Sequence, residues 1–263
     1  TDTVILPGFP NLYTFSPTGT AQYSATYLGY TSTFTNIENI QFGSQFQTTV
    51  ALSDMVSGVV QDHIAKLTDL YLAFFGRAPD VGGLEYWQMR NLNEGRDFAF
   101  ISKDFSWSTE AQALFPASAG NRDFVRLVYV NSFGREPDQG GWDWWTARLD
   151  ALNPSDPDYL NNRGAFVGEL LLGAYAVTSG PEDRGLLTHK HDVAMYYVNQ
   201  LSQHPGNTFD AAINDLLAKV TGDNSTPTRA EQVIDYVLDS AHAITLTGMI
   251  NNPDLLNAVW EGY

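Results

Sequence analysis

The chain has 263 residues, 43% of them hydrophobic and 13% aromatic, which is enough for a packed core and too many for a wholly disordered protein. Its 30 acidic and 14 basic side chains give a formal charge of −16, which argues against nucleic acid as a partner, because phosphates are bound by clustered Lys and Arg. Cysteine is absent, so disulfides, thiolate catalysis and cysteine-ligated metals are excluded.

Residues 1–52 are rich in Thr, Tyr, Phe, Gly and Pro, and poor in Lys, Arg and Ala. Short alternating stretches at 23–28 and 32–37 lie between Gly and Pro residues, a pattern typical of strands and turns. We expect a small antiparallel β segment of three to five strands that ends near Phe42 and Gly43. The first residues have neither an initiator Met nor the charged region of a signal peptide, so we expect a piece of a longer protein.

From Ser53 onward, apolar residues recur at helical spacing, and no apolar run is long enough to span a membrane. The first helix starts at Ser53 and either breaks near His63 or continues to Phe75. The fold class is therefore mainly α, with a multi-helix domain over 53–263 behind the β segment of 1–52. Helices are predicted over 53–63, 66–75, 82–92, 97–114, 123–133, 140–149, 164–177, 183–203, 208–221, 228–246 and 253–260.

Two stretches of this helical part, 70–87 and 128–145, repeat one pattern 58 residues apart. Each reads Tyr-x-x-x-Phe-Gly-Arg-x-Pro-Asp-x-x-Gly-x-x-x-Trp, as in Tyr71 to Trp87. The apolar residues predict one face of a helix, the Gly a helix end, and the Asp the cap of the next helix. We expect a duplicated helix-turn-helix unit, with copies at about 60–116 and 118–180 and a helical extension over 181–263.

This pattern resembles the DUF4214 domain family of secreted and cell-surface bacterial proteins, and is distantly similar to the helical domain of phycobilisome linkers. The family occurs beside calcium-binding RTX repeats, in S-layer proteins and in large adhesins. Residues 1–4 and 33–42 are similar to the module that joins an RTX β-roll to the next domain. The resemblance implies an exported, non-enzymatic surface protein, although the glycine-rich nonapeptides that bind calcium in RTX proteins are absent.

Acidic residues in the two copies offer a weak calcium hypothesis. Asp80 with Glu85, and Asp138 with Asp143, could hold Ca²⁺ together with nearby carbonyl groups. The alternative is helix capping by the two Asp residues and an acidic first turn that suits the helix dipole. A second oxygen-rich stretch could bind calcium or be a solvated insertion; it contains Asp150, Asn153, Asp156, Asp158 and Asn161.

No catalytic motif is present: the chain has no Gly-x-Ser-x-Gly elbow, no His-Glu-x-x-His and no phosphate-binding loop. His189 and His191 are two residues apart, which places them on different faces of a helix, whereas a shared zinc site prefers a spacing of four. A glycosidase needs only two carboxylates, so the sequence leaves a polysaccharide-acting enzyme as an alternative.

The aromatic residues of the repeat are the candidate ligand-binding residues. On a helix, Trp142 and Trp145 share a face while Trp144 points away from them, so at least one should be partly exposed. The first copy offers Tyr86 and Trp87 at the matching place. Exposed Trp or Tyr beside acidic and amide groups stacks on sugar rings, whereas buried Trp serves core packing.

We therefore expect an extracellular or cell-surface bacterial module that binds lipopolysaccharide or exopolysaccharide, with calcium bridging as an option. One alternative is a protein-protein assembly domain of an S-layer protein or adhesin, and the other is the polysaccharide-acting enzyme. None of the three involves nucleic acid or a membrane span.

Overall fold

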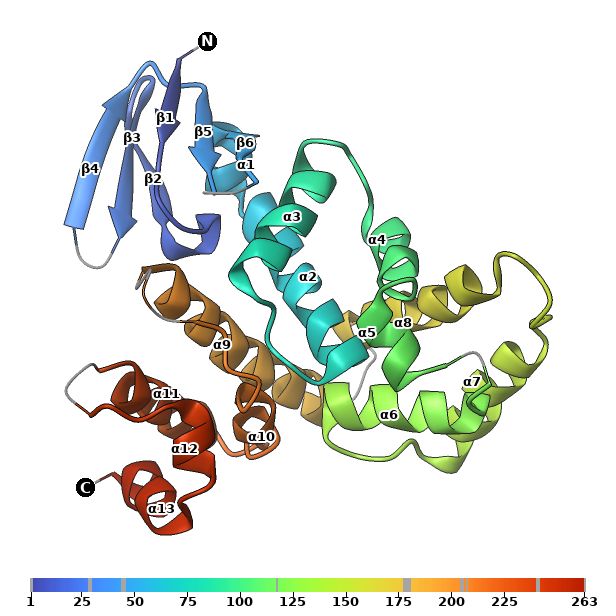
Figure 1. The fold of residues 1–263 in the computed structure, drawn as a ribbon. Coiled ribbons are helices and arrows are strands. Elements are labelled where there is room, and N and C mark those ends of the chain that lie inside the picture. Colours follow the sequence, from blue (N-terminus) through green and yellow to red (C-terminus); the bar gives the residue numbers. More distant parts are fainter. Residues whose placement is uncertain are drawn as a thin grey trace.

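The first part of the computed structural model is a small β segment (Figure 1). The structure describes residues 2–27, 30–43, 46–116, 118–176, 181–203, 206, 208–239 and 242–262. Two three-stranded sheets have the orders β1-β5-β6 and β2-β3-β4. The strands are β1 (Thr3–Ile5), β2 (Thr14–Gly19), β3 (Gln22–Tyr27), β4 (Tyr30–Thr35), β5 (Asn39–Phe42) and β6 (Thr48–Ala51), with a short 3-10 helix, η1, at Pro10–Leu12.

The β segment differs from the sequence prediction in two ways. Its last strand is β6, beyond the end expected near Phe42 and Gly43, because Thr48–Ala51 pairs antiparallel with β5. Moreover, β1 pairs with β5 in parallel, placing Thr3 opposite Asn39, so only the second sheet is purely antiparallel. The pairing of β1 with β5 joins strands far apart in the sequence, which alternation within one strand does not reveal.

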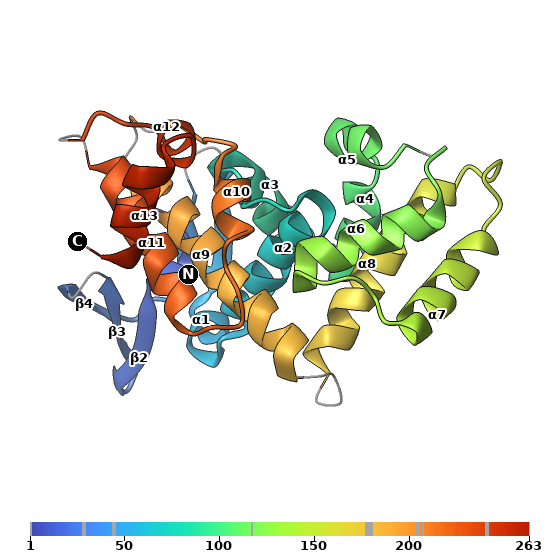
Figure 2. The same cartoon turned by 90° about the horizontal axis from the view of Figure 1, so that it is seen from below.

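Helices make up the rest of the described chain, which confirms the mainly α fold class (Figures 1 and 2). In that part no helix combines the length and apolar character that a membrane span requires. The helices are α1 (Leu52–Ser57), α2 (Val59–Phe75), α3 (Val81–Leu92), α4 (Phe98–Phe105), α5 (Thr109–Leu114), α6 (Asn121–Phe133), α7 (Gln139–Asp150), α8 (Tyr159–Tyr175), α9 (Pro181–Gln203), α10 (Ile213–Leu217), α11 (Ser225–Leu238), α12 (Leu246–Ile250) and α13 (Pro253–Glu261).

Several helix boundaries were wrong. The helix expected over 97–114 is two helices, because Ser108 caps a new one by accepting a hydrogen bond from Ala111 N–H at 3.0 Å. The helix expected from Gly164 begins at Tyr159, and the one expected over 228–246 ends at Leu238. The stretch 208–221 contains only the short α10, and α12 was missed.

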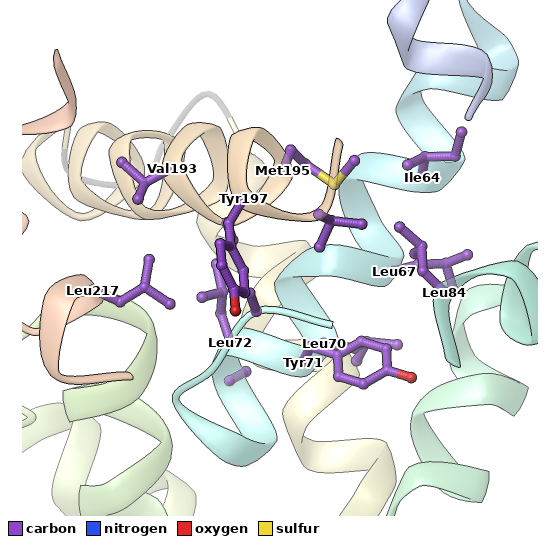
Figure 3. Packing of buried hydrophobic residues seen from close by; sticks show 14 of the residues in the cluster. Ile64, Leu67, Leu70, Tyr71, Leu72, Leu84, Val193, Met195, Tyr197 and Leu217 are labelled. Atoms are coloured by element: carbon purple, nitrogen blue, oxygen red, sulfur yellow. The ribbon is translucent and has the colours of Figure 1, made fainter. Parts of the chain in front are cut away.

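Three long helices form the centre of the helical part. The first helices of the two copies, α2 and α6, pack against each other, and α9 packs against both. Figure 3 shows Met195 and Tyr197 of α9 pointing toward α2, with Tyr197 beside the buried Leu72. Tyr197 is followed by a proline eight residues later, as are Tyr71 and Tyr129. This spacing is the part of the motif that α9 shares with α2 and α6.

The two copies are joined a second time where α4 crosses α8. Ser102 Oγ donates a hydrogen bond to the carbonyl oxygen of Gly164 at 2.7 Å, and both residues are buried. A Cβ on Gly164 would lie 2.7 Å from the carbonyl oxygen of Ser102, so the two backbones are in close contact. The missing side chain of Gly164 is therefore what lets these helices approach.

The β segment covers the first copy and not the second. β6 packs on α3, and one cluster of buried residues runs from Phe42 of the β segment to Leu84 of α3 and beyond. The matching helix of the second copy, α7, lies at the opposite end of the molecule (Figures 1 and 2) and packs against α6 and α8. Division of the chain into domains at residues 52 and 53 stays a prediction, since the core is continuous across it.

Candidate functional site

The link between the first two helices of each copy has the predicted local geometry. Gly76 and Gly134 end α2 and α6 with φ of 65° and 61°, a left-handed conformation that Gly adopts at little cost. The carboxylates of Asp80 and Asp138 then cap α3 and α7, each accepting a hydrogen bond at 2.7 Å from the N–H of the second Gly of the Gly-Gly pair. Both Asp residues thus have a structural role.

The Tyr and the second Gly of the motif fit together in space. A Cβ on Gly141 would lie 3.0 Å from the hydroxyl of Tyr129, and a Cβ on Gly83 would collide with the hydroxyl of Tyr71. Tyr129 also accepts a hydrogen bond from Trp145 Nε1 at 3.2 Å. The motif therefore requires Gly here because a Tyr hydroxyl occupies the space of its side chain.

The arginine of each copy binds an acid that the sequence analysis did not identify. Arg77 forms two hydrogen bonds with Glu110 of α5, at 2.7 and 2.6 Å, and its guanidinium lies 5.1 Å from the centre of the Tyr71 ring. Arg135 binds Asp183 of α9 in the same way, at 2.7 and 2.5 Å. Each arginine therefore ties the helix link to the first turn of a later helix, a two-point contact that suits the guanidinium geometry.

The other predicted calcium residues have different surroundings. Glu85 is only 4% exposed and accepts a hydrogen bond from Phe46 N–H at 3.2 Å, under the β segment. Asp143 is exposed and accepts a hydrogen bond from Gln139 at 2.8 Å. Among the residues that the structure describes, no three His, Asp or Glu side chains form a cluster that could hold a metal ion.

The oxygen-rich stretch before α8 uses its side chains in local turns. Asn153 accepts a hydrogen bond from Ser155 N–H at 3.0 Å, and Asp156 accepts one from Asp158 N–H at 2.9 Å. Asp158 in turn accepts from Asn161 at 3.0 Å, and Asp150 accepts from Asn121 of α6 at 2.9 Å. The bonds of Asn153 and Asp156 are typical of Asx turns, in which a side chain caps its own backbone, and the other two join side chains.

The two histidines of α9 have separate partners, as their spacing predicts. His189 Nδ1 lies 2.8 Å from the carbonyl oxygen of Thr221, whereas His191 Nδ1 lies 3.1 Å from Oδ1 of the buried Asp69. Asp69 also accepts a hydrogen bond from the hydroxyl of Tyr175 at 2.6 Å. Burial lowers the pKa of His191, but the Asp69 carboxylate outweighs it and raises the pKa above its ordinary value. This network joins α2, α8 and α9.

Most of the candidate aromatic residues contribute to packing. Tyr86 is half-buried with its ring edge-on to Phe46 at 5.3 Å, and Trp87 packs against Phe105 at 5.0 Å. Trp145 is half-buried against Phe166 at 4.9 Å.

Trp142 is half-buried too, and its ring is covered by the guanidinium of Arg122, whose central carbon lies 4.0 Å from the ring centre. Tyr86, Trp87, Trp142 and Trp145 therefore offer no free ring face comparable with that of an exposed Trp.

Trp144 is the exception, with 62% of its surface exposed. The predicted exposure of one Trp on this helix is therefore confirmed. Arg148, one turn later, places its guanidinium 5.9 Å from the Trp144 ring centre and 5.4 Å from that of Trp145. Arg148 also forms an ion pair with Glu169 of α8 at 2.7 Å. Trp144 is thus flanked by a cation that a carboxylate holds in place.

A small hollow of about 60 Å³ lies beside this group, between α7 and α8. Its lining includes Trp145, Arg148, Asn162, Phe166 and Glu169. Arg148, Asn162 and Glu169 were missed from the sequence. Only Arg148 had a local signal, because it lies four residues after Trp144 on one helix.

The two copies differ at this surface because of what covers them. Trp144 corresponds to Tyr86 and Asp143 to Glu85 when the copies are aligned 58 residues apart. In the first copy, Phe46 of the β segment lies against Tyr86 and binds Glu85. In the second copy both positions are exposed. We define the α7 surface as Asp143, Trp144, Arg148, Asn162 and Glu169. In the first copy, the positions that match Asp143 and Trp144 are covered by the β segment, whereas in the second copy they are open to solvent.

One part of the chain matches a known protein family. No curated protein and no solved structure matches the chain. Residues 102–153, which include α6 and α7, match the model of a family described as a domain of unknown function, DUF4214. The resemblance predicted from the repeated motif is thereby confirmed for this segment.

Proposed function

We propose that the protein is a non-enzymatic binding module of the bacterial cell exterior that recognises lipopolysaccharide or exopolysaccharide through the α7 surface. The observation that carries this proposal is the exposure of Trp144 at a position whose counterpart, Tyr86, is covered by Phe46. Leaving a large aromatic ring in water is unfavourable, and an exposed indole commonly marks a contact surface.

The polar groups around Trp144 suit a sugar. The apolar face of a pyranose ring stacks on an indole, while its hydroxyl groups need both donors and acceptors close by. Arg148 supplies donors, Glu169 supplies acceptors and the Asn162 amide supplies both, and all three line the hollow beside the ring. A shallow, half-polar surface of this kind fits a chain of sugars better than a small apolar ligand.

The negative charge of the protein determines how it can bind an anionic ligand. With a formal charge of −16, the protein repels an anionic polysaccharide unless cations lie between the two. Asp143 directly precedes Trp144 in the chain and is exposed. Its carboxylate can therefore share a calcium ion with a phosphate or uronate of the ligand. Binding to anionic polysaccharide should therefore need calcium, and binding to a neutral one should not.

A pull-down experiment tests this function. Immobilised protein is incubated with lipopolysaccharide or with a neutral exopolysaccharide, each with calcium and with a chelator. Trp144→Ala should abolish retention, whereas Tyr30→Ala, which removes an 80% exposed aromatic residue from the β segment, should not. Lack of retention of either polysaccharide with or without calcium would refute the proposal, and release of reducing ends from bound polysaccharide would indicate an enzyme instead.

A second candidate function is assembly with another protein, and the internal comparison favours it specifically. The counterpart of the α7 surface in the first copy is covered by protein, with a ring contact to Phe46 and a backbone hydrogen bond to Glu85. Sedimentation over a range of concentrations tests self-association. A complex that forms with rising concentration and is lost in Trp144→Ala would favour assembly, and a monomer at every concentration would count against self-association.

A further inference from the structure

A half-open cavity of about 330 Å³ lies at the junction of α2, α6, α9 and α10. This volume lies at the lower end of the range of small-molecule sites. Figure 3 shows Leu72 of α2 and Leu217 of α10, both of which line it. The residues of its lining that matter here are Leu72, Phe75, Asn131, Lys190, Asn214 and Leu217.

The cavity contains a buried cation. Lys190 is only 6% exposed, and its ammonium donates hydrogen bonds to the carbonyl oxygens of Asn131 at 2.7 Å and Val130 at 3.4 Å. These carbonyls belong to the last turn of α6, where a positive charge is favourable. An ammonium has three N–H donors, so one remains for another acceptor.

Lys190 lacks an acidic partner in the described part of the chain. None of the ion pairs there includes it, although the sequence has 30 carboxylate side chains. Burial lowers the pKa of Lys190 to about 8, so the amine is still mostly protonated at neutral pH. A buried charge is normally paired, because taking it out of water is costly. The carbonyl oxygens of α6 thus face this charge, and no carboxylate of the described residues balances it.

A second polar group of the same cavity is unsatisfied. The side-chain oxygen of Asn214 is buried and has no hydrogen-bond partner among the described residues. Most buried acceptors in folded proteins are paired, so an unpaired one calls for an explanation. The cavity thus combines a cation, an acceptor and apolar walls from Leu72, Phe75 and Leu217.

We propose that this cavity is a binding site for a small organic carboxylate, of the size of a hexuronate or smaller. The carboxylate accepts a hydrogen bond from Lys190 and balances its charge, while a hydroxyl or amino group of the ligand donates to Asn214. The site is separate from the α7 surface, so it does not depend on the proposed binding of polysaccharide.

Titration of the protein with D-glucuronate, lactate and malate, each of which carries both a carboxylate and a hydroxyl group, followed by calorimetry and by amide NMR, tests the proposal. At least one of the three should bind and shift the resonances of Asn131, Lys190 and Asn214. D-glucose, the neutral match of glucuronate, should not bind there. Absence of binding by all three carboxylates, or shifts that lie elsewhere in the protein, would overturn the proposal.

Two variants separate binding from the structural contribution of Lys190. Asn214→Asp places a carboxylate of the protein in the cavity, so the affinity for the carboxylate probe should fall by about tenfold or more while the fold is kept. Lys190→Met should lower the affinity for the probe in the same way. If Lys190→Met does not fold, the affinity of Asn214→Asp alone decides whether the probe binds in the cavity. Trp144→Ala should bind the probe like the unmodified protein. Unchanged affinity in Asn214→Asp would contradict the inference.

Discussion

Replacing Gly164 with Ala should destabilise the protein, because no space is left where α8 crosses α4. The added Cβ would lie 2.7 Å from the carbonyl oxygen of Ser102 and 2.9 Å from Cα of Lys103, both backbone atoms that cannot rotate away. Overpacking of this kind costs about 1–3 kcal/mol. Ala gains about 0.5–1 kcal/mol over Gly inside a helix. The net loss should be about 1–2 kcal/mol, or about 2–8 °C in melting temperature.

Gly173 of the same helix is the matched control, because a Cβ there would meet no atom within 4 Å. Gly173→Ala should be neutral or stabilise the protein by up to about 1 kcal/mol. Urea denaturation followed by circular dichroism measures both variants under one condition. If Gly164→Ala proved as stable as Gly173→Ala, the close crossing of α4 and α8 would be refuted.

Four further substitutions test the contacts that hold the helices. Arg77→Ala should lower the free energy of unfolding by about 1–2 kcal/mol, and Arg135→Ala should lower it by less than about 1 kcal/mol. The reason is that the Arg77 side chain is 13% exposed and the Arg135 side chain 43% exposed. Equal losses in the two variants would contradict this order. Asp138→Ala should cost about 1 kcal/mol through the lost cap, equally with calcium and with a chelator; a loss seen only with calcium would support the metal alternative. Because Asp69 raises the pKa of His191 above 6.5, the stabilisation by protonated His191 is complete below that pH and is lost as pH rises through the folded pKa. The stability difference between the unmodified protein and His191→Gln should therefore fall with rising pH in urea titrations, and a constant difference would count against this pairing.

The sequence predicted the helix ends and helix caps of the motif, because these depend on neighbouring residues. A Gly at a helix end and an Asp before the next helix act within a few residues, and both copies have these features where expected. The break at Ser108 was missed, because its capping signal lay inside a continuous apolar pattern that favoured one helix.

The partners across long stretches of chain could not be predicted. Glu110 is 33 residues from Arg77 and Asp183 is 48 residues from Arg135, and nothing local distinguishes them from the other acids. The same holds for Lys190 and Asn214, which meet only because α10 folds back beside α9.

Exposure of the aromatic residues was predictable only in part. Helical periodicity alone places Trp144 away from Trp142 and Trp145. The same periodicity gives no reason for the difference between Trp144 and its counterpart Tyr86. That difference arises because Phe46 and the β segment fold over the first copy, which is a tertiary event.

The most direct test of the account is fluorine NMR of protein labelled with fluorotryptophan and titrated with a polysaccharide retained in the pull-down. The chain has six Trp residues, so each resonance can be assigned by single substitution. The resonance of Trp144 should shift or broaden, while that of Trp260, on α13 away from α7 in Figure 1, should stay unchanged. A polysaccharide that binds without affecting the Trp144 resonance would contradict the α7 surface as its binding site.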